Sequence, residues 1–404
     1  MLIFALLLAQ AAAPDSALYN RARAYMADIL ANQPNYTCLE TIDRSEQGKA
    51  KAKFEVIDSL RFEVAFVDKR ELYAWPGAKK FDDTSILDMV PEGAAIATGA
   101  FAGHAQYLFQ SNIATVKAGE WAEEGGTRYA RYPFTVPAER SRYMLMKSKK
   151  ESAAVGYSGE IWIEPLTARV SRISLHAEDI PAKLEIRKTA TLIEYGAAKI
   201  GSREFWLPSR SVEEITASSG RTDRNITRFS GCRAFLGESR LRFDEVPAED
   251  PAAAAVPIKT IDLPPGLWFE LQFDEGVSSQ KSVVGDLIPA TLSSDIKHKG
   301  MVLFPKGSEL ELRLVRIQHM RDAISLEFSL GDVKSKTAVA LMRAIPDPTI
   351  KPRGTIAPGV PQSYGDAARP GLGTYFIRGD RMTLRKGYRS AWVTTPERPS
   401  DKQN

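Results

Sequence analysis

From Tyr36 onward most of the chain alternates apolar and polar residues in short segments, and this period of two limits it to a mainly β fold. Segments such as YTCLETIDRSE, AKFEVIDSLRFEVAFVD and TATLIEYGAAKI are rich in Val, Ile, Phe and Thr, and turn residues or charges separate them. Successive side chains of a strand point to opposite faces, so each segment can bury one face. The series predicts a large, curled antiparallel sheet with a few helices.

Two helical regions accompany the strands. In DSALYNRARAYMADILANQPN, Asp15 or Ser16 can cap the start and Pro34 prevents continuation. The apolar residues of this segment recur at helical spacing, at Leu18, Ala22, Met26, Ile29 and Leu30. A second helical signal lies between residues 82 and 112, at Ile86, Leu87, Phe101, Ala105, Leu108 and Phe109. We therefore expect helices that pack against the sheet.

The first residues, MLIFALLLAQAAA, form an apolar run followed by small residues, which is the layout of a secretory signal. The run is shorter than the roughly 20 apolar residues that span a bilayer. No Lys or Arg precedes it. We predict a signal peptide over residues 1–13, cleaved after Ala11, and export to a bacterial periplasm.

Two cysteines occur in the chain, Cys38 and Cys232. An even number of cysteines in an exported protein predicts a disulfide, and the alternative is two separate buried thiols. If they pair, they close a long loop, and the chain-entropy model gives at most about 5 kcal/mol of stabilisation.

The composition changes along the chain indicate two domains. We expect the first over residues 14–246, followed by a Pro- and Ala-rich linker at 247–262. Alternating segments broken by Gly and Pro then predict a small β-barrel over 263–395, with a disordered tail at 396–404.

The segment GYSGEIWIEPLTARVSRISL, at 156–175, places Glu160 and Glu164 on either side of Trp162. Alternating residues and the turn sequence EPLT predict two strands of a hairpin, with both carboxylates on the face of the tryptophan. The alternative is a catalytic carboxylate pair of an envelope hydrolase.

Signals for other chemistry are missing from the sequence. The four histidines have no metal-binding spacing, so we expect no metal site and interpret each as a surface or partly buried imidazole: His104, His176, His298 and His319. No nucleophile elbow and no phosphate-binding loop occurs, so we expect no cofactor. The 54 basic and 50 acidic residues are interspersed, which argues against nucleic-acid binding. Adjacent acidic residues such as Glu213 and Glu214 are predicted on opposite faces of a strand.

The order of helix, strands, helical insertion and further strands, with GEIWIEPLTARVSRI late in the domain, resembles the outer-membrane lipoprotein-carrier and sigma-regulator superfamily over roughly residues 16–245. The segments PNYTC, HAEDIP and CRAF are similar to those of a group of exported soil-bacterial proteins with no assigned activity. The resemblance implies a half-barrel sheet with a helical lid and a cavity for acyl chains or another apolar ligand.

In the second domain, LPPG at 263–266, VGD at 284–286 and FPKGS at 304–308 resemble the β-barrel domain of the outer-ring scaffold of type IV secretion channels. This resemblance is short, and it says nothing of secretion by this chain. Our leading hypothesis assigns partner docking to this small barrel.

Our leading hypothesis is an exported, non-enzymatic protein that binds a lipid or other apolar ligand in the half-barrel. Seven aromatic residues are candidates for the cavity lining: Phe62, Phe66, Trp75, Phe101, Trp121, Trp162 and Trp206. The alternative is an envelope scaffold or sensor whose core is filled by its own side chains and which acts through protein partners. Lys147, Lys149 and Lys150 indicate either peripheral membrane contact or a solvated sheet edge.

Overall fold

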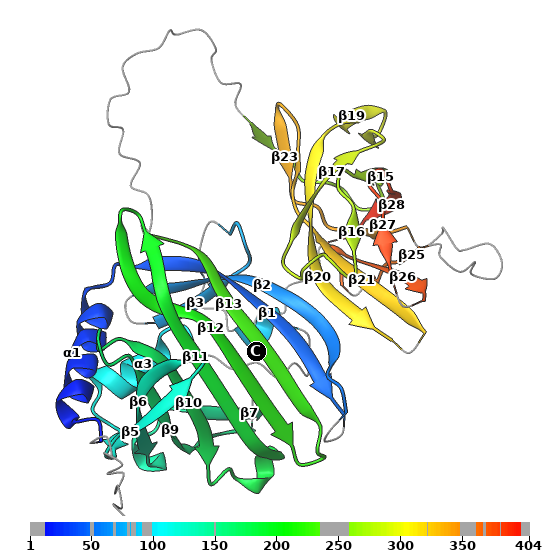
Figure 1. The fold of residues 1–404 in the computed structure, drawn as a ribbon. Coiled ribbons are helices and arrows are strands. Elements are labelled where there is room, and N and C mark those ends of the chain that lie inside the picture. Colours follow the sequence, from blue (N-terminus) through cyan, green and yellow to red (C-terminus); the bar gives the residue numbers. More distant parts are fainter. Residues whose placement is uncertain are drawn as a thin grey trace, which may run out of the picture. The chain divides into compact units, whose positions relative to one another are not determined.

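The computed structural model describes residues 13–48, 52–67, 70–78, 81, 86–90, 99–148, 151–234, 258–320, 322–347, 361–366, 369–379 and 381–396. Within these ranges the chain is mainly β with a few helices, as the alternation predicts (Figure 1). It divides into two compact units. The first holds the described residues up to 234, except Ile57–Phe62 and Trp75–Gly77, which group with the residues from 258 onward in the second.

The main feature of the first unit is a curled 11-stranded sheet with the order β3-β2-β1-β13-β12-β11-β10-β9-β6-β4, in which β5 also pairs with β6. A separate hairpin joins β7 and β8. The strands are β1 (Tyr36–Gln47), β2 (Glu55–Val67), β3 (Arg70–Ala74), β4 (Thr115–Val116), β5 (Glu120–Glu124), β6 (Thr127–Val136), β7 (Met144–Ser148), β8 (Glu151–Ala154), β9 (Gly156–Ile163), β10 (Val170–Glu178), β11 (Ile186–Ile200), β12 (Arg203–Ala217) and β13 (Thr222–Ala234). The helical elements are α1 (Ser16–Asn32), α2 (Ile86–Met89), α3 (Gly103–Ala105), the π-helical turn η1 (Gln106–Gln110), and the 3₁₀ turns η2 (Ala138–Arg140) and η3 (Ala182–Leu184).

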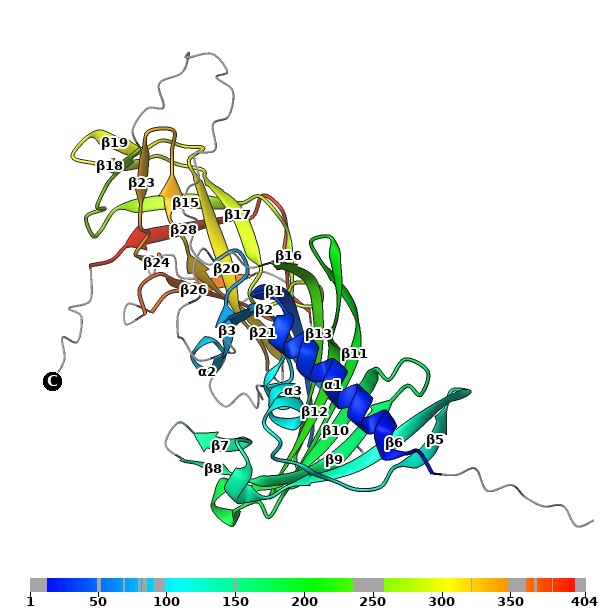
Figure 2. The same cartoon turned by 90° about the vertical axis from the view of Figure 1, so that its left-hand side faces the viewer.

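Helix α1 covers one face of this sheet. Asp15 caps it as predicted, because its side chain accepts a hydrogen bond of 2.8 Å from the backbone N–H of Leu18. Its buried residues, together with buried residues of η1, share one hydrophobic core with inward side chains of the strands, such as Ile161, Ile173 and Ile193. We call the sheet face that carries these isoleucines the inner face and the opposite one the outer face. Figure 2 shows the sheet bending around α1 and α3.

Glycine and proline allow the sheet to curl. A Cβ at Gly159 would lie 1.9 Å from the carbonyl oxygen of Ser174 on the neighbouring strand, so only glycine fits this close approach of β9 and β10. On β12, Pro208 lies where the register with β11 shifts between Glu194 and Tyr195. Such a bulge bends a strand and increases its twist, which helps the sheet to wrap around the helices.

Cys38 and Cys232 form a disulfide with a Cα–Cα distance of 4.1 Å, so the pairing that we predicted is confirmed. The bond joins β1 to β13 across a separation of 194 residues. Structural disulfides are typical of oxidising, extracytoplasmic environments, and this favours an exported protein. The signal peptide that we predicted lies almost wholly in residues 1–12, outside the described residues. None of the helices that the structure describes is both long and apolar enough to cross a membrane.

The second unit contains another 11-stranded sheet, with the order β14-β23-β22-β20-β17-β15-β28-β24 and with β21, β25 and β26 attached through β20. β16 pairs with β27 and β18 with β19 in separate two-stranded sheets. The strands of the unit are β14 (Lys259–Thr260), β15 (Trp268–Phe273), β16 (Val277–Ser278), β17 (Leu287–Leu292), β18 (Ile296–His298), β19 (Met301–Phe304), β20 (Glu309–His319), β21 (Ala323–Leu330), β22 (Val333–Lys334), β23 (Ala338–Ala340), β24 (Ala344–Pro346), β25 (Gln362–Tyr364), β26 (Leu372–Arg378), β27 (Thr383–Leu384) and β28 (Arg389–Thr394). Phe273, Phe328 and Tyr375 pack edge to face in its core, with ring centroids 5.5–5.9 Å apart.

One short strand lies within the range predicted as linker. β14 falls inside residues 247–262 and pairs in parallel with β23 of the second unit. Two residues of backbone pairing need no alternating pattern, so the sequence carries no signal for this strand. The rest of the linker up to residue 257 lies outside the described residues.

Candidate functional site

The stretch 156–175 forms the hairpin of β9 and β10 that the sequence predicts. Its two glutamates are held by different partners. Glu164 accepts a hydrogen bond of 3.0 Å from the hydroxyl of Thr167 within the turn. Glu160 accepts one of 3.2 Å from the indole N–H of Trp162 and lies 3.5 Å from the guanidinium of Arg131. Both carboxylates therefore have partners within or beside the hairpin.

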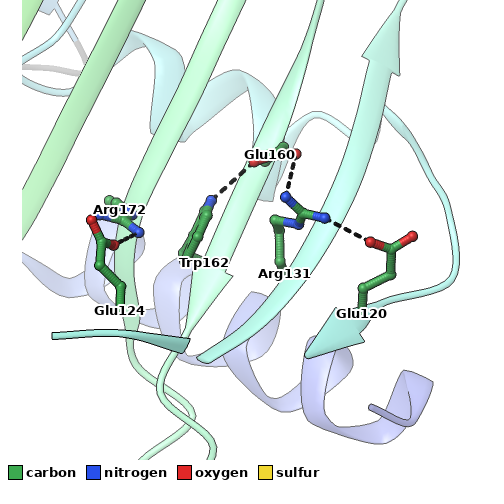
Figure 3. Close-up of polar contacts among 6 residues, drawn as sticks. All are labelled: Glu120, Glu124, Arg131, Glu160, Trp162 and Arg172. Atoms are coloured by element: carbon green, nitrogen blue, oxygen red, sulfur yellow. Dashed lines mark hydrogen bonds and ion pairs between the residues drawn. The ribbon is translucent and has the colours of Figure 1, made fainter. Parts of the chain in front are cut away.

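Glu160 belongs to a row of charged side chains on the outer face (Figure 3). Arg131 pairs with Glu120 at 2.6 Å, and Arg172 pairs with Glu124. The guanidinium of Arg172 also lies over the ring of Trp162, 3.8 Å from its centroid. Each carboxylate in this row faces an arginine, and Glu120 and Glu160 share Arg131.

Three of the predicted lining tryptophans have other roles. Trp162 belongs to the outer row just described. Trp121 and Trp206 pack against the hydrophobic core of the first unit, and each has an arginine over its ring, at 3.9 and 4.6 Å from the centroid. Both side chains are partly buried against this core.

The remaining four aromatic candidates lie in different surroundings. Phe101 lines a cavity, described below. Phe66 packs on Tyr36, with ring centroids 6.1 Å apart. Phe62 and Trp75 contact each other at 5.1 Å and group with the second unit. The described residues thus bring one of the seven candidates to the cavity, because the others find partners in nearby packing.

A small polar cavity lies on the inner face of the first unit. Its volume is about 20 Å³, room for roughly one water-sized group, and it is partly enclosed. Strand register assembles it, since Glu213 lies opposite Thr191 on one side and Asn225 on the other, and Ser211 lies opposite Thr227. The residues that line it are Glu40, Ile42, Tyr73, Ala100, Phe101, His104, Thr191, Ser211, Glu213, Asn225 and Thr227.

Glu40 is the most unusual group of the cavity. It is 6% exposed, and its Oε2 atom has no hydrogen-bond partner in the part of the chain that the structure describes. Burial, and to a lesser extent the nearby charge of Glu71, raise the pKa of this carboxyl to about 8. At neutral pH these surroundings therefore favour a protonated, uncharged Glu40.

Glu71 organises one wall of the cavity. It accepts hydrogen bonds of 2.8–3.0 Å from the backbone N–H groups of Gly99, Ala102 and Gly103 and from the hydroxyl of Tyr73. Gly99 has a φ of +97°, which favours glycine, and a Cβ there would lie 3.2 Å from Nε2 of His104. Glu71 thus fixes the turn that places α3 beside the cavity.

His104 corrects one expectation from the sequence. We interpreted every histidine as a surface or partly buried imidazole, but His104 is 6% exposed and lines the cavity. Its ring packs edge to face on Tyr143, with centroids 5.5 Å apart. Burial lowers the pKa of this imidazole to about 4, although the charge of Glu71 acts in the opposite direction. His104 is therefore neutral at physiological pH, a state that suits an apolar and aromatic environment.

The adjacent glutamates of β12, Glu213 and Glu214, lie on opposite faces of the sheet, as alternation along a strand requires. Glu213 is buried on the inner face, where its Oε2 accepts a hydrogen bond of 3.4 Å from the amide of Asn225. Glu214 faces outward and pairs with Arg224 at 2.7 Å. Our prediction that the two carboxylates point to opposite faces is confirmed, and it leaves Glu213 as a second carboxyl of the cavity.

The cavity offers hydrogen-bond acceptors and titratable groups, which are features of binding sites. Among the described residues, no three His, Cys, Asp or Glu side chains are grouped in a way that could hold a metal ion. The hydroxyls of Thr191, Ser211 and Thr227 and the amide of Asn225 can orient a bound group by hydrogen bonds. The small volume admits a single polar group and not an acyl chain.

The sequence analysis missed most of these residues, and one signal points to them in retrospect. On β11, β12 and β13 the buried positions of the inner face carry Thr, Ser, Glu and Asn where a purely structural core needs apolar residues. A run of polar residues at one parity of three successive strands marks a polar patch inside a sheet. Six of the seven aromatic candidates lie away from this polar patch, and Phe101 alone lines the cavity with it.

Fold and site together define a class of protein, a curled half-barrel with a buried polar cavity on its inner face. No family model matches the chain, and no curated protein matches it. The two family resemblances in the sequence therefore remain predictions. Among solved structures, the chain is similar to the crystal structure of a DUF1329 family protein from Desulfovibrio piger, with 12% sequence identity, a TM-score of 0.28, and coverage of 58% of this chain and 98% of that chain.

Proposed function

We propose that the protein is exported and binds a small ligand, or one polar end of a larger ligand, in the inner-face cavity, without catalysing a reaction on it. The observation that carries this proposal is Glu40, a buried carboxyl that lines the cavity and whose Oε2 has no partner among the described residues. Leaving a buried polar atom unsatisfied costs about 1–3 kcal/mol. A ligand that supplies the missing hydrogen bond explains why the chain carries this group.

The size of the cavity supports binding more than catalysis. Perturbed titratable groups in a pocket are also typical of active sites. Catalysis, however, needs a substrate and a reacting group in contact at the same place, and about 20 Å³ holds one water-sized group. We therefore propose a non-enzymatic role.

A lipid is the finer form of this proposal. Ile42, Ala100 and Phe101 line the cavity beside its polar groups, so the site can contact an amphipathic molecule at its polar end. The apolar part of such a ligand requires space beyond the cavity itself. The disulfide supports a periplasmic location for such a carrier, because disulfides form and persist in oxidising compartments.

Native mass spectrometry tests the proposal. The protein is exported to a bacterial periplasm and purified without detergent, and the same sample is denatured and searched for released small molecules and lipids. We expect a discrete adduct on the protein that is absent from a Glu40→Gln variant prepared in parallel. A bare mass for the unaltered protein, unchanged after incubation with an envelope extract, would contradict ligand binding.

A second candidate, a scaffold or sensor that acts through protein partners, is favoured by exposed apolar side chains of the second unit. Met301 and Val302, on the hairpin of β18 and β19, are 64% and 49% exposed, and Trp268 is 49% exposed. A photo-crosslinking residue at position 301, compared with one at the exposed polar position Lys299, tests this role in cells. Partner capture at 301 alone favours the scaffold, and equal capture at both positions argues against it.

A further inference from the structure

We propose that the inner-face cavity binds a cationic ammonium group, carried by a free amine or by a lipid headgroup, with Glu40 as its counter-ion. This inference rests on the proposed function and adds the chemical class of the ligand. It follows from the charge of the lining, from the unpartnered acceptor, and from the number of acceptors that surround the space.

The lining is acidic. Glu40 and Glu213 are its two carboxyls, and the described lining residues include no Lys or Arg. Glu71 adds a third negative group close enough to raise the pKa of Glu40. The buried arginine of this strand, Arg44, lies two residues beyond Ile42 and opposite Asn225 of the lining, and its charge also acts to lower the pKa of Asp223. The two lining carboxyls and Glu71 thus attract a cation, and Arg44 acts in the opposite direction.

The unpartnered Oε2 of Glu40 is an independent indication of a ligand. The residue is more than nine-tenths buried and lines the cavity, and its Oε2 has no hydrogen-bond partner in the described chain. A hydrogen bond from a charged donor to a carboxylate is about twice as strong as a neutral one. An ammonium group is therefore the ligand that this atom binds best.

The geometry suits an ammonium group better than a metal ion. An ammonium group donates up to three hydrogen bonds. Glu40 can accept one, and the hydroxyl-bearing residues Ser211 and Thr227 line the same space. The described residues provide no cluster of three His, Cys, Asp or Glu for a metal. The ring of Phe101 adds an aromatic surface of the kind that attracts organic cations.

Binding of a cation is coupled to a proton. Glu40 is protonated at neutral pH because of burial and of Glu71, and a bound ammonium reverses that effect by favouring the carboxylate. The other titratable groups that line the cavity are Tyr73, His104 and Glu213, and His104 stays neutral above about pH 4. We expect the release of close to one proton per ammonium bound at pH 7, and an affinity that rises about tenfold from pH 6 to 7.

Titration calorimetry with three probes tests the inference on the full chain. Ethanolamine carries the ammonium group, ethylene glycol is its neutral counterpart, and glycolate is its anionic counterpart. We expect ethanolamine alone to bind. Affinity should fall at least tenfold in Glu40→Gln and stay within twofold in Glu160→Gln, which removes a carboxylate of the outer row instead.

Two further measurements are needed. One distinguishes a lipid headgroup from a free amine as the ligand, and the other gives a result that a misfolded variant cannot affect. Dihexanoyl phosphatidylethanolamine is compared with dihexanoyl phosphatidylglycerol, and binding of the first alone identifies a lipid headgroup as the source. A pH-indicator dye in weakly buffered solution reports proton release on the unaltered protein, so the outcome does not depend on the folding of a variant.

The outcomes distinguish this inference from the proposed function. Binding of glycolate or ethylene glycol at least as tight as that of ethanolamine overturns the ammonium assignment and leaves ligand binding intact. Equal binding of the two phospholipids also overturns it. If no probe binds and the exported protein carries no adduct, both proposals fail.

Discussion

The carboxylates on the two faces of the sheet have opposite surroundings. On the outer face, Glu120 and Glu160 share Arg131, and both remain partly exposed. On the inner face, Glu40 is buried beside Glu213 without a lining cation. Exposed pairs contribute little to stability, whereas a buried carboxyl without compensation weakens the fold unless a ligand uses it. The difference marks the outer row as structural and the cavity as the place to look for function.

The largest effect should come from Glu40. Its folded-state pKa of about 8 lies above the unfolded value near 4.5, so it contributes stability at low pH that is lost as pH rises toward 8. The loss is about 5 kcal/mol at most. Glu40→Gln removes this dependence, and urea unfolding at pH 5, 7 and 9 should show the variant to be the more stable protein at pH 9. If the free energy of unfolding changed equally with pH in the two proteins, Glu40 would not differ from the exposed carboxylates of the outer face.

His104 should show the reverse dependence. Its folded-state pKa of about 4 lies below the unfolded value of 6.5, so the stability present above pH 6.5 is lost as pH falls through 4. The size is about 3 kcal/mol. We expect His104→Gln to unfold less readily on acidification than the unaltered protein, measured by circular dichroism from pH 7 to 4. His176→Gln, at an exposed position, is the matched control and should unfold on acidification like the unaltered protein.

Glu71 tests whether the wall of the cavity depends on one side chain. Glu71→Ala removes the acceptor of four hydrogen bonds, three of them from backbone N–H groups. We expect a loss of about 2–3 kcal/mol in the free energy of unfolding, since hydrogen bonds to a charged group are worth about that amount. Hydrogen exchange at Gly99, Ala102 and Gly103 should accelerate with it. Unchanged exchange there, or an equal loss in Glu164→Ala, would mean that the turn is held by other contacts.

The smallest effect is expected on the outer face. Glu160→Gln keeps the contact with Trp162 and removes the charge facing Arg131. Partly exposed pairs are worth less than about 1 kcal/mol, and salt screens them. The thermal midpoint should change by a few degrees or less, and the change should shrink in high salt. A loss of several kcal/mol would show that the outer row has a role beyond charge balance.

Local patterns gave the elements of this fold correctly. The helix that begins after Asp15, the hairpin of β9 and β10 and the pair of Cys38 and Cys232 were all predicted, because capping, alternation and cysteine count act over short distances or through a single bond. The curl of the sheet was expected from the spacing of the turn-bounded strands and the helix that precedes them. The position at which Gly159 allows it was not, since a glycine in a strand has several explanations.

The candidate site was harder to predict, because it depends on which face of each strand turns inward. In YTCLETID, one parity carries Cys38, Glu40 and Ile42, and the other carries Leu39 and Thr41, so the pattern does not single out an inner face. Burial of Glu40 follows from its register with Phe229 on β13, almost two hundred residues later. Trp162 misled the prediction because an arginine above its ring lets a tryptophan remain on a solvated face.

The pairing of β1 with β13 sets the order in which the first unit can be completed. A chain that is synthesised from its amino end presents Cys38 long before Cys232, with 194 positions between them. Until the later cysteine arrives, the earlier one is a free thiol and the β13 side of β1 is an unprotected strand edge, the kind of surface that invites misassembly. Glu40, two residues from that thiol, is enclosed only at the same late step. The cavity is therefore a feature of the finished, oxidised domain, and a nascent chain has no means of holding a ligand there.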